Sequence, residues 1–238
     1  MRKQNHFNAF RQHMIDTFEL GRNSIPATVN TRNFTPAFYD MKLEANRTSY
    51  FVQAISRALK KVPACNSSFI RNRWTNRSRI VYFDEVCCTV SVDKIINEQH
   101  FPVGCVIKNS DQLSIKEIYE KILHVKNTPV EELPELVGFI KFLKLPRFIR
   151  KFIMREIICN EELFKKKLGT FNLSELGMIE GVVGGAMPSP RLVVDFVPLK
   201  ETKEIGLGFN FNHAIVDGYH IAKLNSEIVN TFKKADFF

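Results

Sequence analysis

The clearest pattern of hydrophobic and polar positions lies near the C-terminus. Apolar side chains alternate with small or polar ones over 205–213, which predicts a β-strand whose last inward side chain is His213. Asp217 and Gly218 predict a turn, and apolar positions over 221–232 then recur at helical spacing. We therefore expect a strand, a turn that carries His213, and an amphipathic helix.

Other stretches predict elements of the same two kinds. An apolar stripe over 7–18 indicates a short helix, followed by extended structure from Ala27. The spacing of apolar residues over 48–62 predicts a buried helix that ends before Pro63. Residues 80–83 and 86–92 are candidate strands.

The segment 136–164 mixes large apolar side chains with lysines and arginines, and Pro146 divides or kinks it. Two interpretations remain open. The segment is a core helix whose long cations reach the solvent, or it lies on an anionic membrane or grips a lipophilic acyl chain.

Composition bounds the class of protein. The chain of 238 residues is 45% hydrophobic, enough for a sizeable core, and we expect one domain over 1–238. A formal net charge of +9 suits an anionic partner such as a phosphate-bearing ligand, nucleic acid or an acidic membrane surface, or it is simply a solvated basic surface. Of these partners we do not expect nucleic acid. No signal peptide or membrane-spanning run is visible.

The chain has 5 cysteines without a C-x-x-C pair, which predicts buried thiols in a reducing compartment and a cytoplasmic location. Cys87 and Cys88 have no basic neighbour that would lower the pKa of a thiol, so we do not expect a reactive thiolate at either position. We expect no metal site.

His213 is the main catalytic candidate. An imidazole at the end of an apolar strand face, with Asp217 close in sequence, suits a general base. The alternative is a structural histidine followed by an aspartate that caps a helix.

Three motifs resemble the CoA-dependent acyltransferase superfamily, which includes chloramphenicol acetyltransferases and dihydrolipoamide acyltransferases. The run from His213 to Gly218 resembles its H-x-x-x-D-G signature. Residues 101–118 are similar to a "PVI-K-x-A-D…S-I-x-E-I" passage, and 169–178 to "GTFTISNLGM". The resemblance covers most of the chain, and order and spacing agree.

The resemblance implies an α/β two-layer sandwich, a mixed β-sheet with helices packed on it, assembled as a homotrimer with active sites between subunits. It implies that His213 is the base and that Ser174 stabilises the oxyanion. Asp217 would pair with an arginine, either Arg11 or Arg2, and fix the turn. The small residues Gly184 and Gly185 lie in a loop that lets a pantetheine arm approach, or that simply bends.

Three functions follow from these observations. The first is transfer of an acyl group from acyl-CoA to an unidentified small thiol or hydroxyl acceptor, without a covalent acyl-enzyme. The second is a core component of a 2-oxoacid dehydrogenase-type complex. Because no lipoyl or subunit-binding domain is expected in this chain, lipoylated proteins would act in trans. Asn212 and Ala214, which flank His213, resemble the chloramphenicol enzymes more closely. The third is a non-catalytic scaffold or membrane-surface protein of the same fold.

Overall fold

The computed structural model describes residues 26–34, 46–71, 78–96, 99–175, 189, 191–199 and 204–233. The strands within these ranges are β1 (Pro26–Phe34), β2 (Ser67–Arg71), β3 (Ser78–Tyr82), β4 (Cys88–Ile96), β5 (Gln99–Ile107), β6 (Phe171–Glu175), β7 (Leu192–Leu199) and β8 (Glu204–Asn212). The α-helices are α3 (Arg47–Lys61), α4 (Ile115–Asn127), α5 (Pro134–Leu143), α6 (Arg147–Cys159), α7 (Glu161–Leu168) and α8 (Gly218–Lys233). Short 3₁₀ turns span Pro63–Cys65 and Val130–Glu132.

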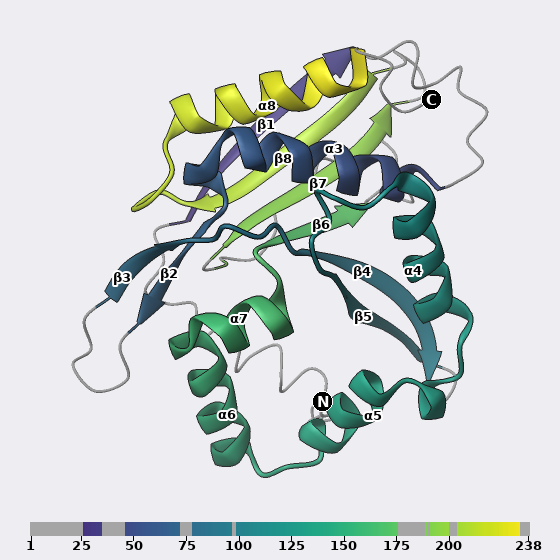
Figure 1. Cartoon of the computed structure of the whole chain (residues 1–238). Helices are drawn as coiled ribbons and strands as arrows, with labels where there is room; N and C mark the ends of the chain where they lie inside the picture. Colours follow the sequence, from purple (N-terminus) through teal and green to yellow (C-terminus); the bar gives the residue numbers. More distant parts are fainter. Residues whose placement is uncertain are drawn as a thin grey trace, which may run out of the picture.

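The main sheet is mixed. Its six strands run in the order β1-β8-β7-β6-β4-β5, and β2 pairs with β3 in a separate hairpin. Strand β6 is parallel to both β4 and β7, whereas β1, β8 and β7 alternate in direction. Helices α3 and α8 lie across the sheet, and α5, α6 and α7 form a separate group beyond β5 (Figure 1). The predicted mixed sheet with helices packed on it is confirmed.

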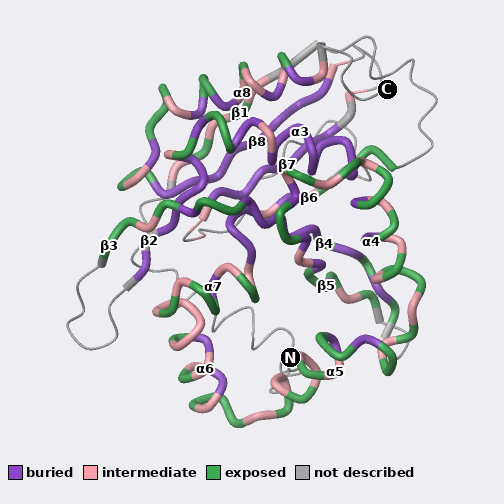
Figure 2. Tube along the Cα trace, viewed as in Figure 1, coloured by how far each residue is buried: buried purple, intermediate pink, exposed green. Residues whose placement is uncertain are grey.

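The core lies between the sheet and helix α3. Phe51 of α3 stacks on Phe196 of β7 with ring centroids 4.1 Å apart, and it contacts Phe232 of α8 at 5.0 Å. The side chain of Asn46 accepts a hydrogen bond from the Ser49 N–H and begins α3. The helix ends before Pro63, so the buried helix predicted over 48–62 is confirmed (Figure 2).

Proline 146 separates α5 from α6, as the sequence predicted. The predicted strands at 80–83 and 86–92 are present as β3 and β4, although β4 begins at Cys88 and continues to Ile96. The helix predicted over 7–18 lies outside the described residues.

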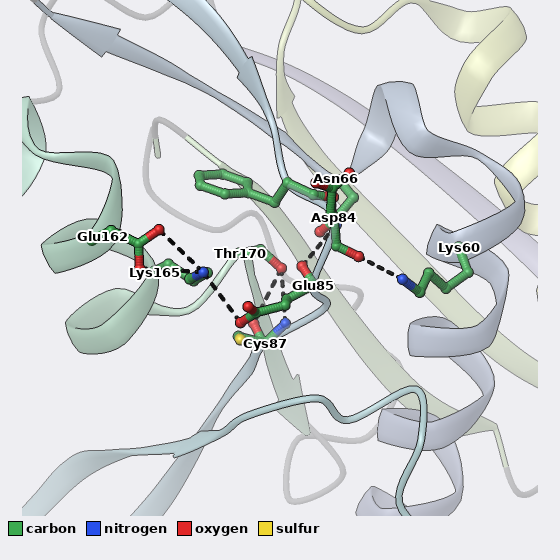
Figure 3. A network of polar contacts seen from close by, with 9 residues as sticks. Lys60, Asn66, Asp84, Glu85, Cys87, Glu162, Lys165 and Thr170 are labelled. Carbon is green, nitrogen blue, oxygen red and sulfur yellow. Dashed lines mark hydrogen bonds and ion pairs between the residues drawn. The ribbon is translucent and has the colours of Figure 1, made fainter.

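The turn between α7 and β6 is held tightly against the start of β4. The Thr170 N–H donates to the carbonyl of Cys87 at 2.7 Å, and the Cys87 N–H donates to the Thr170 hydroxyl at 3.1 Å. Lys165 of α7 forms an ion pair at 3.2 Å with Glu85, which lies in the loop that precedes β4 (Figure 3). These contacts explain in structural terms why a glycine and a threonine begin the 169–178 motif.

Gly169 adopts φ 69° and ψ 176°, a backbone conformation that is essentially restricted to glycine. A Cβ atom there would lie 2.7 Å from the Cys87 carbonyl oxygen and 2.7 Å from the Thr89 hydroxyl. We expect Gly169→Ala to lower the free energy of unfolding by about 2–4 kcal/mol in urea titrations, because strain and steric overlap add.

Gly138 provides the matched control. It lies within helix α5, and a Cβ atom at this position meets nothing within 4 Å. Gly138→Ala should therefore be neutral or stabilise by up to about 1 kcal/mol. Equal effects of the two substitutions would contradict the role assigned to Gly169.

Candidate active site

His213 follows directly after the last residue of β8. Asn212 ends the strand, and its main-chain carbonyl accepts the N–H groups of Ile215 and Val216 at 3.0 and 3.1 Å. Its side-chain oxygen accepts the Ala214 N–H at 3.1 Å. Because Asn212 turns the chain at this point, His213 leaves the strand and is exposed. The ring contacts Phe211 edge-on at 6.0 Å, so His213 lies on the side of the sheet that the pattern predicts, but it is exposed and not packed in the core.

The main chain sets the tautomer of His213. Its Nδ1 atom lies 3.1 Å from the carbonyl oxygen of Val216. A carbonyl oxygen only accepts hydrogen bonds, so Nδ1 carries the proton when the ring is neutral. The lone pair is then on Nε2, and a neutral imidazole in this state can accept a proton.

Asp217 caps the N-terminus of helix α8. Its Oδ1 atom accepts the main-chain N–H of His220 at 3.1 Å and lies 2.8 Å from Nδ1 of His220. The hydrogen bond from the His220 N–H, aided by the His220 ring, lowers the pKa of Asp217 below its usual value. Among the described residues, the ring beside this carboxylate is therefore that of His220, while the carbonyl of Val216 orients His213.

Ser174 lies on β6 at a different place in the sheet. Leu173 points into the core, so the alternation of the strand puts Ser174 on the face opposite α3 and α8. Ser174 aligns with Asp195 of β7, which aligns with Gly208 of β8, five residues before His213. From strand spacing and rise, the two Cα atoms are about 15–20 Å apart. One chain therefore does not bring Ser174 and His213 together.

A chain of hydrogen-bonded polar side chains lies beside Ser174 on the same face. Asp195 is 3% exposed and accepts a hydrogen bond from the Asn210 amide at 3.1 Å. The Thr28 hydroxyl donates to the other end of that amide at 2.6 Å, which links β1, β8 and β7. Burial raises the pKa of Asp195 to about 6.

The remaining predicted site residues lie outside the described residues. These are Arg11, its alternative Arg2, and the loop glycines Gly184 and Gly185. The sequence analysis missed Asn212, His220 and Asp195 as parts of the site. An asparagine just before the motif and a histidine three residues after Asp217 were available signals. The burial of Asp195 had no sequence signal.

Four of the cysteines are buried, as predicted, and Cys159 is half-buried. Burial raises the pKa of the Cys87 and Cys88 thiols, which opposes thiolate chemistry there. Within the described ranges, no three His, Cys, Asp or Glu side chains are grouped to hold a metal ion. None of the described helices is long and apolar enough to cross a bilayer.

Asp195 makes stability depend on pH. Because its folded-state pKa of about 6 exceeds the ordinary value of 3.8, the folded state binds the proton more tightly and loses stability as pH rises between these values. Asp195→Asn keeps an acceptor for Asn210 without the charge. We expect this variant to be about 1–2 kcal/mol more stable than wild type above pH 6, measured by urea unfolding.

The difference should disappear below about pH 4, where both forms of the side chain are neutral. The exposed Asp84 supplies a control, since Asp84→Asn makes the same substitution at a carboxylate that is not buried. A pH-independent difference between Asp195→Asn and wild type would contradict the interpretation.

Comparison with known proteins identifies the fold. No protein-family model matches the sequence, and no curated protein matches it significantly. Solved structures do match over almost the whole chain. The truncated catalytic core of the 2-oxoacid dehydrogenase multienzyme complex from Thermoplasma acidophilum is 14% identical with a TM-score of 0.67, covering 99% of this chain and 100% of that one.

Two further structures agree. A probable dihydrolipoamide acetyltransferase from Listeria monocytogenes is 17% identical with a TM-score of 0.63, covering 98% of this chain and 95% of that chain. A chloramphenicol acetyltransferase is 12% identical with a TM-score of 0.54, covering 95% and 96%. The chain therefore has the fold of the dihydrolipoamide acetyltransferase and chloramphenicol acetyltransferase catalytic cores.

Proposed function

We propose that the protein is an acyltransferase that moves an acyl group from acyl-CoA to a small thiol or hydroxyl acceptor. The observation that carries the proposal is the hydrogen bond between Nδ1 of His213 and the Val216 carbonyl oxygen. It holds an exposed imidazole in the tautomer that presents a basic Nε2 atom. The fold shared with acetyltransferase cores supports the same reaction class.

In the proposed reaction, Nε2 of His213 takes the proton of the acceptor thiol or hydroxyl as that atom attacks the thioester carbonyl carbon. The new bond forms a tetrahedral intermediate, and the Ser174 hydroxyl donates to its oxyanion. When the intermediate collapses, the carbon–sulfur bond to coenzyme A breaks. The proton on His213 passes to the departing thiolate. No bond forms between the acyl group and the protein.

The positions of Ser174 and His213 support an active site shared between two copies of the chain. The two residues lie on opposite faces of the sheet and toward opposite ends of its strands. A second copy can bring its Ser174 to the His213 of the first, and repetition around a threefold axis closes a ring. The homotrimer implied by the sequence resemblance has this arrangement, and we propose it here.

A second function has specific support. The matching structures include the cores of two dehydrogenase multienzyme complexes and two dihydrolipoamide acetyltransferases. We therefore also propose that a lipoyl group, carried by another protein, is the acceptor thiol. Co-purification with a lipoylated protein, together with transfer to dihydrolipoamide, would favour this function over a free small acceptor.

The first test measures coenzyme A release from acetyl to palmitoyl donors, with dihydrolipoamide and chloramphenicol as trial acceptors. We expect His213→Ala to lower kcat/KM by about 10²–10⁴, the contribution of a positioned general base. His124→Ala, which replaces an exposed histidine at the end of α4, is the control and should retain wild-type activity. Failure of the wild-type protein to bind or cleave any acyl-CoA would favour the non-catalytic scaffold.

The shared site is tested by mixing variants. Ser174→Ala should lower kcat by about 10²–10³ through loss of an oxyanion donor. When it is co-expressed with His213→Ala, one subunit supplies the intact histidine and its neighbour the intact serine. About a quarter of the sites then regain both groups by random assembly, so activity should rise well above that of either variant alone. Activity no higher than the mean of the two parents would contradict a site shared between two copies of the chain.

A further inference from the structure

The outer side of helix α6 carries an unusual combination of residues. We define the α6 outer face as Arg147, Phe148, Lys151, Phe152 and Arg155. The phenylalanine side chains are large and apolar, yet Phe148 is 74% exposed and Phe152 is 53% exposed. In Figure 2 helix α6 consists mostly of exposed and intermediate residues, whereas strands β7 and β8 are mostly buried.

The helical period gathers these residues on one side. Phe148 and Phe152 are four residues apart, and Lys151 and Arg155 have the same spacing, so each pair shares a face of the helix. The buried residues of α6, Arg150 and Met154, lie on the side of the helix opposite the two phenylalanines. Exposed aromatic rings and cations therefore lie next to each other, away from the core.

Hydrogen bonds from Arg150 hold helix α6 against the end of helix α5. The buried guanidinium of Arg150 donates to the main-chain carbonyls of Leu143 and Leu145 at 3.0 Å each. These carbonyls belong to the last residue of α5 and to the turn that follows it, where helix carbonyl groups need partners. Arg150 thus fixes α6 relative to α5 without adding to the exposed charge.

The charge around the rings is strongly positive. Apart from the buried Arg150, there are five lysines and arginines between Pro134 and Cys159, against two glutamates. Lys141 and Lys144 of the α5 end are exposed, as are Arg147 and Arg155. A core helix with cations reaching the solvent would bury its phenylalanines, so that interpretation of the sequence is wrong for this side of α6.

The combination fits a lipid surface better than a second copy of the chain. Two exposed phenylalanine rings offer at most about 400 Å² of apolar surface, well below the roughly 800 Å² per partner of a stable protein interface. A symmetric contact between two such faces would also place cations against cations. A bilayer with anionic headgroups takes the rings into its interfacial region and brings lipid phosphates close to the cations.

We propose that the α6 outer face docks the protein onto an anionic phospholipid bilayer. Phe148 and Phe152 enter the boundary between headgroups and acyl chains, while Arg147, Lys151 and Arg155 contact lipid phosphates. The interaction is peripheral and reversible. It goes beyond the proposed acyl transfer and does not depend on it, because no residue of the α6 outer face takes part in the proposed reaction.

The test is sedimentation of the full chain with vesicles of phosphatidylcholine alone or mixed with phosphatidylglycerol. Wild type should bind the anionic vesicles, bind pure phosphatidylcholine much more weakly, and dissociate as salt is raised. Phe148→Ser with Phe152→Ser should lower the partition coefficient about tenfold for each ring lost. Because both rings are exposed, the variant should keep the wild-type unfolding curve, which is measured alongside.

Matched controls come from exposed residues elsewhere. Ile80→Ser with Tyr82→Ser removes apolar side chains that are 39% and 58% exposed on β3, and Lys166→Gln with Lys167→Gln removes exposed cations of α7. Both controls, and His213→Ala, should bind vesicles as wild type does. The proposal is overturned if wild type ignores anionic vesicles or if the phenylalanine variant binds equally well. It is also overturned if the phenylalanine variant dissociates the protein's oligomer, because the face would then be an interface between copies.

Discussion

The hydrogen bonding of β8 on both sides is the constraint on which the rest of the structure depends. The strand pairs with β1 along its whole length and with β7 over most of it, and its side chains from Ile205 to Asn212 are buried. A shift of one residue would turn every side chain to the wrong face, so the register is firmly set. The chain must therefore leave the sheet at His213, and α8 must return over the core.

The same sheet keeps the two chemical groups apart. Alternation places Ser174 on the face opposite the helices, while the contact with Phe211 keeps His213 on the helix side. Since a packed sheet does not bend enough to join its faces, chemistry that uses both groups needs a second copy. In the proposed reaction, stability and function thus depend on different contacts: the core holds each chain, and the proposed assembly completes the site.

Two buried charges show how the fold accommodates polar groups. Lys94 of β4 is 7% exposed, and its ammonium donates to the carbonyls of Val125, Lys126 and Thr128 at the end of α4. Arg150 has the corresponding role at the end of α5. Both cations satisfy carbonyl groups that a helix end leaves unpaired. The basic character of the chain is therefore partly structural, and the exposed cations of α6 stand out against it.

Local physics explains what the sequence alone determined. The strand before His213, helix α3, the break at Pro146 and the cap at Asp217 follow from side-chain period, proline geometry and capping, each within a few residues. The tertiary structure alone decided the separation of Ser174 from His213, the partners of His213 and Asp217, the burial of Asp195 and the exposure of Phe148. These depend on which strands become neighbours and which helix faces are covered, and such contacts between distant residues leave no period in the sequence.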